Sequence, residues 1–110
     1  MNLDGIRGSG RYTDVVTRAT HAVLESAGDT PTAQRWAAFH RRAAELPADL
    51  RDYVGKVEKH AYRITDEDVE ALKRAGYSED AIFEITAAAA LGAAIARLER
   101  GLIVLHESRA

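Results

Sequence analysis

The chain of 110 residues contains no cysteine, and this absence excludes disulfide bonds, thiolate metal sites and thiol redox catalysis. Proline is scarce, and both prolines, Pro31 and Pro47, stand where helices are predicted to begin. The net charge of −2 provides no basic excess of the kind that binds nucleic acid. We therefore expect no nucleic-acid partner.

Long hydrophobic runs are also missing. The longest stretch without a charged residue, Ile85 to Ala96, has 12 residues, whereas a membrane span needs roughly 20 apolar residues. We expect a buried helix here and no membrane partner. The first ten residues are polar and rich in glycine, so they do not resemble a signal peptide. We therefore expect a cytoplasmic protein. We interpret residues 1–12 as a flexible arm and residues 13–110 as one helical domain.

The rest of the chain has a helical pattern, with apolar residues at spacings of three and four and a glycine after several periodic segments. This pattern predicts an all-α fold of about five helices. They run from Thr13 or Asp14 to Ala27, from Pro31 to about Glu45, from Pro47 to about Ala61, from a cap at Thr65 to Gly76, and from Glu79 to about Leu105.

Two details of these helices are specific enough to be tested. The second helix is predicted to turn an apolar stripe inward, and its outer face is predicted to carry Arg35, His40, Arg41 and Arg42. Gly55 lies inside the third helix, where glycine is unfavourable, so we expect a neighbouring backbone to approach it closely.

The fourth helix begins with T-D-E-D, Thr65 to Asp68, which is a variant of the capping box. Ser78 is predicted to cap the last helix, which is rich in alanine. Between Glu84 and Arg97 this helix is apolar on all sides and must be covered on all sides. Because four short helices offer little cover, we predict that other subunits share it. The alternative is a central helix in a monomeric bundle.

The segment G-Y-S-E-D-A-I-F-E-I, Gly76 to Ile85, resembles the G-x-S/T-x-E/D-x-I-x-E signature of the alkyl hydroperoxidase D-like and carboxymuconolactone decarboxylase superfamily. The resemblance covers about residues 45–105. It implies an alkyl hydroperoxidase D-like helical bundle that assembles into homotrimers or homohexamers through intertwined helices.

The resemblance also shows which reactive residues are missing. Counting back from Gly76 places Ala61 and Ile64 where the redox branch has its two cysteines, and Asp68 where both branches have a histidine. Asp49 falls near an acid of the redox branch. Reduction of peroxide by a dithiol is therefore excluded, whereas lactone decarboxylation lacks its expected histidine.

His60 and Asp68 are the candidate catalytic residues, because a histidine beside a carboxylate can move protons near neutral pH. The alternative for Asp68 is a structural role at the third position of a helix. The positions predicted to line a pocket are Ala61, Ile64, Asp68 and Arg97. Arg97 is predicted to reach an interface or cavity and to pair with Glu84 or Asp68, or else to complement the end of its helix.

Neither an H-x-x-x-H nor an E-x-x-H pairing occurs, so we expect neither a metal nor a cofactor. Three hypotheses follow. The chain is a thiol-less member of the superfamily that self-associates and binds a small molecule; or it is a decarboxylase-like enzyme acting on a small cyclic acid; or it is a structural or protein-interaction module.

Overall fold

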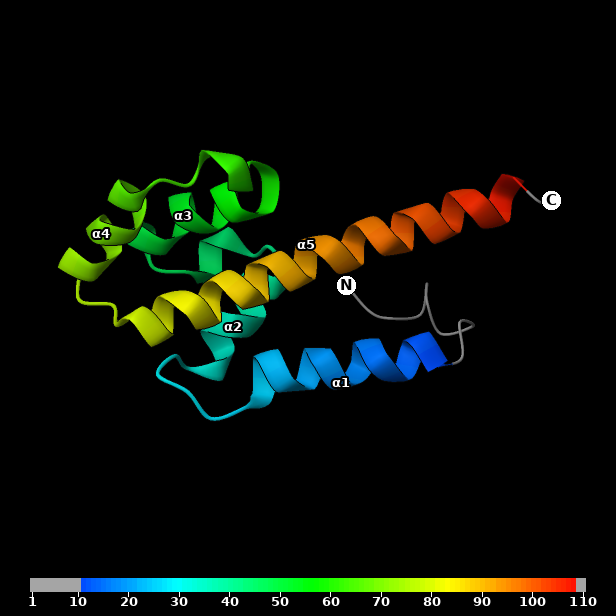
Figure 1. Ribbon diagram of the computed structural model, residues 1–110, viewed down its shortest axis with the longest axis horizontal. Helices are drawn as coiled ribbons and strands as arrows, with labels where there is room; N and C mark the ends of the chain where they lie inside the picture. The colour runs from blue at the N-terminus through cyan, green and yellow to red at the C-terminus, as the bar shows by residue number, and fades with distance from the viewer. Residues whose placement is uncertain (1–10, 109–110) are drawn as a thin grey trace.

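A computed structural model describes residues 11–108 of the chain. It contains five α-helices in this range and no strand, which confirms the predicted all-α class (Figure 1). The helices are α1 (Arg11–Glu25), α2 (Thr32–Phe39), α3 (Ala48–Lys59), α4 (Asp66–Arg74) and α5 (Glu79–Ser108), with 3₁₀ turns η2 (Ala43–Glu45) and η3 (Ala61–Arg63). The predicted arm lies mostly outside the described residues, and Arg11 and Tyr12 already belong to α1.

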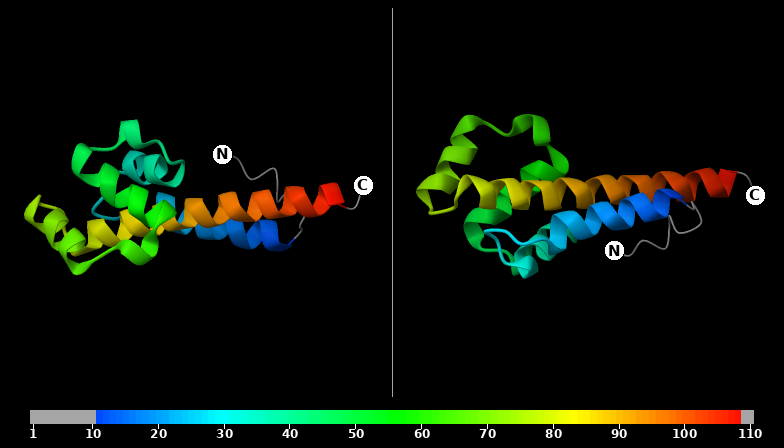
Figure 2. Two further views of the ribbon diagram at one scale, coloured as in Figure 1. Left: turned by 90° about the horizontal axis from the view of Figure 1, so that it is seen from above. Right: turned by 60° about the horizontal axis from the view of Figure 1, so that its bottom comes forward.

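Helix α5 is the spine of the fold. Its 30 residues span about 45 Å, and every other helix packs against it. Helices α2 and α3 cover its first half, α4 lies near its N-terminal end, and α1 runs beside its second half (Figures 1 and 2). The core forms where these helices meet, and its fully buried large apolar side chains are Leu24, Leu50 and Ile85.

Gly92 marks the closest approach of two helices. A Cβ atom built on it would lie 2.8 Å from the carbonyl carbon of Phe39 and 2.9 Å from its Cα, with the carbonyl oxygen nearer still. The backbones of α5 and α2 therefore touch at this point. At Gly55, by contrast, no atom lies within 4 Å of such a Cβ. The prediction of a close backbone contact at Gly55 is wrong, and Gly92 has that role.

The predicted second helix is too long, because α2 ends at Phe39. Arg41 has a φ of 59°, in the left-handed region. The amide of Arg41 donates to the carbonyl of Ala38 at 3.2 Å, and the amide of Arg42 donates to that of Ala37 at 2.9 Å. These two bonds form a Schellman motif, which ends a helix and is usually built on glycine. The chain then turns into η2, and Ala43 is exposed.

Arg35 is buried, not solvated as predicted. Its side chain is 2% exposed, and its guanidinium donates to the carbonyls of Val23 and Thr30, both at 3.2 Å. Val23 lies in the last turn of α1, where unpaired carbonyls favour a cation. Arg35 thus joins the end of α1 to the start of α2.

A second polar contact holds the same connection from the other side. The carboxylate of Glu84 on α5 accepts hydrogen bonds from the amides of Asp29 at 3.0 Å and Thr30 at 2.8 Å. A Cβ on Gly28 would lie 2.6 Å from the Cδ of Glu84, so a side chain at residue 28 would displace the carboxylate from its present position. Burial alone would raise the pKa of the Glu84 carboxyl. The amide of Asp29 and the amide and hydroxyl of Thr30 together lower this pKa by more, so the net pKa lies below its usual value.

Candidate functional site

A groove of about 610 Å³ lies between α3 and α4 and contains both candidate catalytic residues. The charged, aromatic and histidine side chains that line it are Asp49, Arg51, Asp52, Tyr53, Lys56, Lys59, His60 and Asp68. Gly55 leaves its floor open, because no side chain projects there. The groove has the size of a small-molecule site. Its chemistry depends on which of its polar side chains are already held by hydrogen bonds or ion pairs within the protein.

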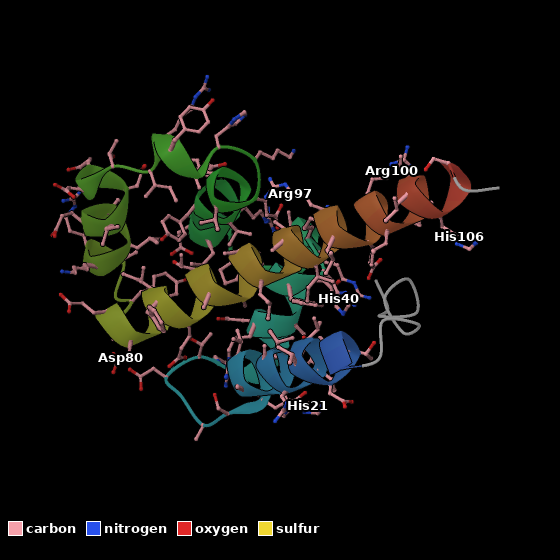
Figure 3. The ribbon with its side chains drawn as sticks, turned by 45° about the vertical axis from the view of Figure 1, so that its right-hand side comes forward. His21, His40, Asp80, Arg97, Arg100 and His106 are labelled. Carbon is pink, nitrogen blue, oxygen red and sulfur yellow. The ribbon has the colours of Figure 1, made fainter. Side chains whose placement is uncertain are left out.

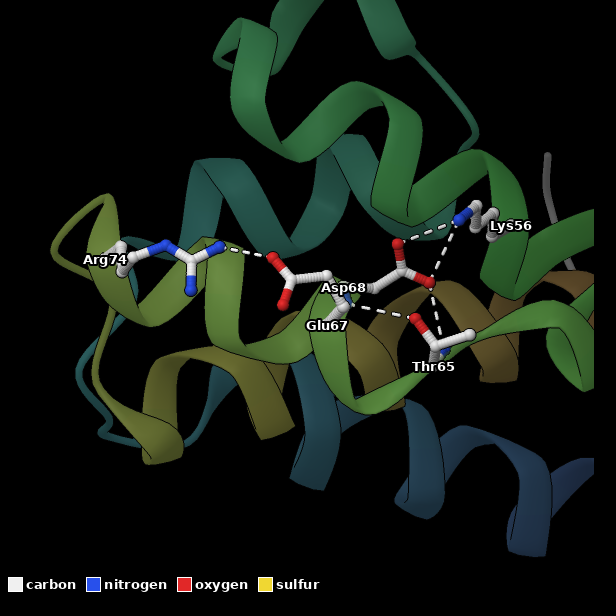
Figure 4. A network of polar contacts seen from close by, with 5 residues as sticks. All are labelled: Lys56, Thr65, Glu67, Asp68 and Arg74. Carbon is white, nitrogen blue, oxygen red and sulfur yellow. Dashed lines mark hydrogen bonds and ion pairs between the residues drawn. The ribbon is translucent and has the colours of Figure 1, made fainter.

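Both carboxylate oxygens of Asp68 are occupied (Figure 4). The ammonium of Lys56 donates to Oδ1 at 2.8 Å and to Oδ2 at 2.9 Å, and the amide of Thr65 donates to Oδ2 at 2.9 Å. The amide of Asp68 in turn donates to the Thr65 hydroxyl at 3.2 Å, which completes the predicted capping box.

These donors decide the protonation of Asp68. The hydrogen bond from Lys56, followed by that from the Thr65 amide, lowers the pKa of the Asp68 carboxyl below its usual value. The group therefore stays ionised near neutral pH and has no proton to donate. Asp68 therefore has a structural role: it caps the start of α4 and, through Lys56, links α4 to α3. Glu67 and Arg74 form a separate ion pair along α4 (Figure 4).

His60 lies at the C-terminal end of α3 and is exposed. Its Nδ1 atom is 3.5 Å from the hydroxyl of Tyr62, and the two rings meet edge to face with centroids 5.9 Å apart. Within residues 11–108, His60 has no hydrogen bond or ion pair with Asp68 or Glu67. The predicted proton-moving pair therefore shares a groove without direct contact.

Asp49 belongs to the same groove and has a partner that the sequence did not suggest. The hydroxyl of Tyr77 donates to Oδ1 of Asp49 at 2.7 Å. Burial, together with this bond, raises the pKa of Tyr77 to about 12. Tyr77 lies between Gly76 and Ser78, at the turn into α5, so this bond fixes the turn against the start of α3. The signal in the sequence was the tyrosine directly after the glycine stop.

The other predicted pocket residues are not in this groove. Ala61 is exposed in η3, and Ile64 is partly buried against the core. Arg97 lies on α5 beside a different groove, and its guanidinium donates to the backbone carbonyl of Glu58 at 2.9 Å. The structure therefore does not show the predicted pairing of Arg97 with Glu84 or Asp68. In the described part of the chain, no three His, Asp or Glu side chains gather as metal donors.

The second candidate site is an apolar surface on α5. Phe83 is 72% exposed, Leu98 44% and Leu105 48%, on a helix whose opposite face forms the core. Small residues lie between them, and together they form what we call the α5 stripe: Phe83, Ala87, Ala90, Ala94, Leu98, Gly101 and Leu105. All are exposed except Ala87, which is half-buried. An apolar surface of this length is typical of an interaction site.

By length and composition α5 could also cross a membrane, a property that core helices of soluble proteins share; 44% of its most apolar stretch is buried within the chain. Comparison of the sequence and the structure with family models, curated proteins and solved structures gave no match.

Proposed function

We propose that this chain is a self-associating helical protein, a thiol-less relative of the alkyl hydroperoxidase D-like and carboxymuconolactone decarboxylase superfamily, whose copies pair through the α5 stripe. The observation that carries the proposal is the exposure of Phe83, Leu98 and Leu105 on the face of α5 that points away from the core. Burying such side chains contributes roughly 1.5–3 kcal/mol each when fully removed from water.

The spacing along the stripe supports a helix as its partner. The steps from Phe83 to Leu105 are four, three and four residues, repeated once. This is an eleven-residue repeat with about 3.67 residues per turn, close to that of a straight α-helix. The stripe therefore stays on one side of α5 over its whole length, and a second straight helix could follow it.

The stripe is also complementary to itself. When two copies of α5 are laid antiparallel with Ala94 at the two-fold axis, Phe83 of one copy faces Leu105 of the other. Ala87 then faces Gly101, and Ala90 faces Leu98. Ala90 and Ala94 leave space near the centre, where Leu98 of each copy packs over Ala90 of the other, and Phe83 and Leu105 lie at the ends. A contact of this kind pairs identical surfaces and builds dimers, or hexamers when trimers are joined.

Charges argue for this soluble arrangement over a membrane span. Glu84 and Arg97 bracket the uncharged part of α5, whose 12 residues extend about 18 Å, well short of the roughly 30 Å of a bilayer core. The opposite face of the same stretch is already buried against α2 and α3. We therefore keep a cytoplasmic location as part of the proposal.

Light scattering coupled to size-exclusion chromatography tests the proposal. The wild-type chain is expected to elute with the mass of an even number of copies. Ala94→Glu places a charge at the centre of the stripe and is expected to yield monomers with unchanged helicity. Ala33→Glu is the matched control, because Ala33 is an exposed alanine on α2, away from the stripe. A wild-type monomer, or an Ala94→Glu variant that keeps its mass, would contradict self-association; a trimer would contradict the antiparallel pairing.

The groove between α3 and α4 supports a second candidate, decarboxylase-like chemistry on a small cyclic acid. The observation in its favour is that Asp49, His60 and Asp68 line one groove. Since Asp49 and Asp68 are held by Tyr77 and Lys56, His60 is the group left to move a proton. A panel of small cyclic acids should raise the melting temperature of the wild-type protein, and His60→Ala should abolish turnover of any acid that is consumed. Unchanged turnover in that variant would remove His60 from the mechanism.

A further inference from the structure

A second groove, which we call the basic groove, lies between α5, the end of α3 and the turn after α2. Its volume is about 460 Å³. The four cationic side chains that line it are Arg41, Lys59, Arg97 and Arg100, and Glu58 is the acid among its lining residues. Arg97 and Arg100 lie about one turn apart on α5 (Figure 3). An adjoining hollow of about 350 Å³ shares Arg41 and Arg100 and adds His40 and Glu99.

In the part of the chain that the structure describes, salt bridges do not neutralise the cations of this groove. Within residues 11–108, none of Arg41, Lys59 and Arg100 forms a salt bridge, and Arg97 donates to a neutral carbonyl, that of Glu58. Even with Glu58 and Glu99 both ionised, the two hollows retain an excess of two positive charges, four cations against two acids. Burial lowers the pKa of His40, so His40 adds little further charge at neutral pH.

The hydrogen bonding of the two acids, Glu58 and Glu99, is incomplete. One carboxylate oxygen of Glu58 and one of Glu99 are buried without a hydrogen-bond partner in the structure. Burial raises the pKa of Glu58, while the charges of Arg41 and Lys59 oppose that rise. Both side chains are only partly buried and line the hollows, so a molecule bound there meets carboxylate acceptors as well as cations. A molecule that fills this groove would therefore need donors as well as negative charge.

The backbone at Arg41 gives an independent observation. Arg41 occupies the left-handed position of the Schellman motif that ends α2, where glycine is the favoured residue. An arginine there is strained relative to glycine, and strained residues gather at binding sites. The turn carries the Arg41 side chain into the groove, which a glycine could not do.

We propose that the basic groove binds a small phosphorylated molecule that carries hydroxyl groups. A phosphate has two negative charges near neutral pH and several acceptor oxygens, which matches the excess charge and the donor forks of three arginines. Hydroxyl groups on the same molecule would donate to Glu58 and Glu99. The groove is large enough for a ligand the size of a sugar phosphate. It lies to one side of the α5 stripe and shares only Gly101 with it.

Isothermal titration calorimetry with ribose 5-phosphate and with inorganic phosphate tests this site. We expect saturable binding of both, with ribose 5-phosphate the tighter ligand. Arg100→Ala is expected to weaken it at least about tenfold, the loss of one charge-assisted hydrogen bond. Arg18→Ala is the matched control, because Arg18 is exposed on α1, far from the groove in sequence and not among its lining residues. No saturable binding up to about 10 mM, or equal weakening by both variants, would overturn the proposal.

Arg41→Gly separates binding from folding. Glycine relieves the backbone strain, so this variant is expected to melt at the same temperature as the wild type or higher, while ribose 5-phosphate binds at least about tenfold more weakly. A variant that binds as the wild type does would exclude Arg41 from the site and overturn the argument. Sedimentation with vesicles containing phosphatidic acid tests the other source of phosphate: binding to these vesicles without binding to ribose 5-phosphate would overturn the soluble ligand.

Discussion

Gly92→Ala provides the sharpest test of the fold, because it adds one methyl group where two backbones meet. A Cβ on residue 92 would lie 2.8 Å from the carbonyl carbon of Phe39, whereas ordinary van der Waals contact begins at 3.4 Å. The obstacle is backbone, which cannot rotate aside as a side chain can. Helix α2 must therefore move away from α5, or α5 must bend.

The size of the effect follows from two opposing contributions. Adding a methylene to a well-packed core costs about 1–3 kcal/mol, and contact with the backbone of Phe39 favours the upper end. Alanine gains about 1 kcal/mol over glycine inside a helix. The net loss in the free energy of unfolding is thus about 2 kcal/mol, which should lower the melting temperature by roughly 8 °C or more for a domain of this size.

Gly55→Ala is the control, since it makes the same substitution inside a helix with no atom within 4 Å of the new Cβ. Only the gain in helix propensity remains there, so this variant should be more stable by about 0.5–1 kcal/mol. Urea titrations followed by circular dichroism, at one protein concentration, measure both variants against the wild type. If Gly92→Ala were as stable as the wild type, or if the two variants shifted in the same direction, the contact between α2 and α5 would be refuted.

Two further predictions concern the polar contacts around the connection between α1 and α2. Because the pKa of Glu84 is lowered in the folded state, its contribution to stability is present above the unfolded pKa near 4.5 and is lost as pH falls through the folded value. Glu84→Gln should therefore cost about 2 kcal/mol at pH 7 and much less at pH 3, by urea titration at both values; an equal cost at both would contradict the role of the ionised carboxylate. Arg35→Met keeps the apolar stem but leaves the carbonyls of Val23 and Thr30 without their donor, and should cost about 2 kcal/mol in the same assay. Arg18→Met, on the exposed face of α1, should change stability by less than about 0.5 kcal/mol, and equal effects of the two substitutions would contradict the burial of Arg35.

The elements of this fold that local signals govern could be predicted from the sequence. Thr65 and Asp68 form the expected capping box, Gly76 has a φ of 104° after α4, and Ser78 accepts a hydrogen bond from the amide of Ala81 at the start of α5. Each of these features involves residues within a few positions of one another. The periodic pattern of apolar residues was strong enough to locate all five helices.

Features that depend on the packing of distant segments could not be predicted. An arginine in an amphipathic helix is normally solvated, and only the placement of the end of α1 near Arg35 makes burial favourable. The run of small residues around Gly92 predicts a tight helix crossing, which its contact with α2 confirms, whereas a Cβ on Gly55 would meet no atom within 4 Å. The turn at Arg41 was missed because an arginine stands where the motif prefers glycine.

The candidate site was predicted only in part, for the same reason. The resemblance of the following segment grouped His60 and Asp68, and both residues line one groove. Lys56, the partner that decides the protonation of Asp68, lies on a neighbouring helix and could not be assigned beforehand, whereas Tyr62 lies only two residues after His60. The basic groove has no local pattern at all, since its residues come from three separate segments of the chain.

The thin attachment of α4 has a consequence for the motions of the molecule. Leu72 is the buried residue of α4 and Val69 packs half-buried against the core, and polar contacts such as that between Lys56 and Asp68 supply the rest of the attachment. A segment with so little buried apolar surface opens at a small fraction of the free energy of global unfolding. The amides of α4 should thus exchange with solvent hydrogen well before those of α2 and the middle of α5. One side of the groove between α3 and α4 is therefore a helix that we expect to unfold and refold locally while the rest of the protein stays folded.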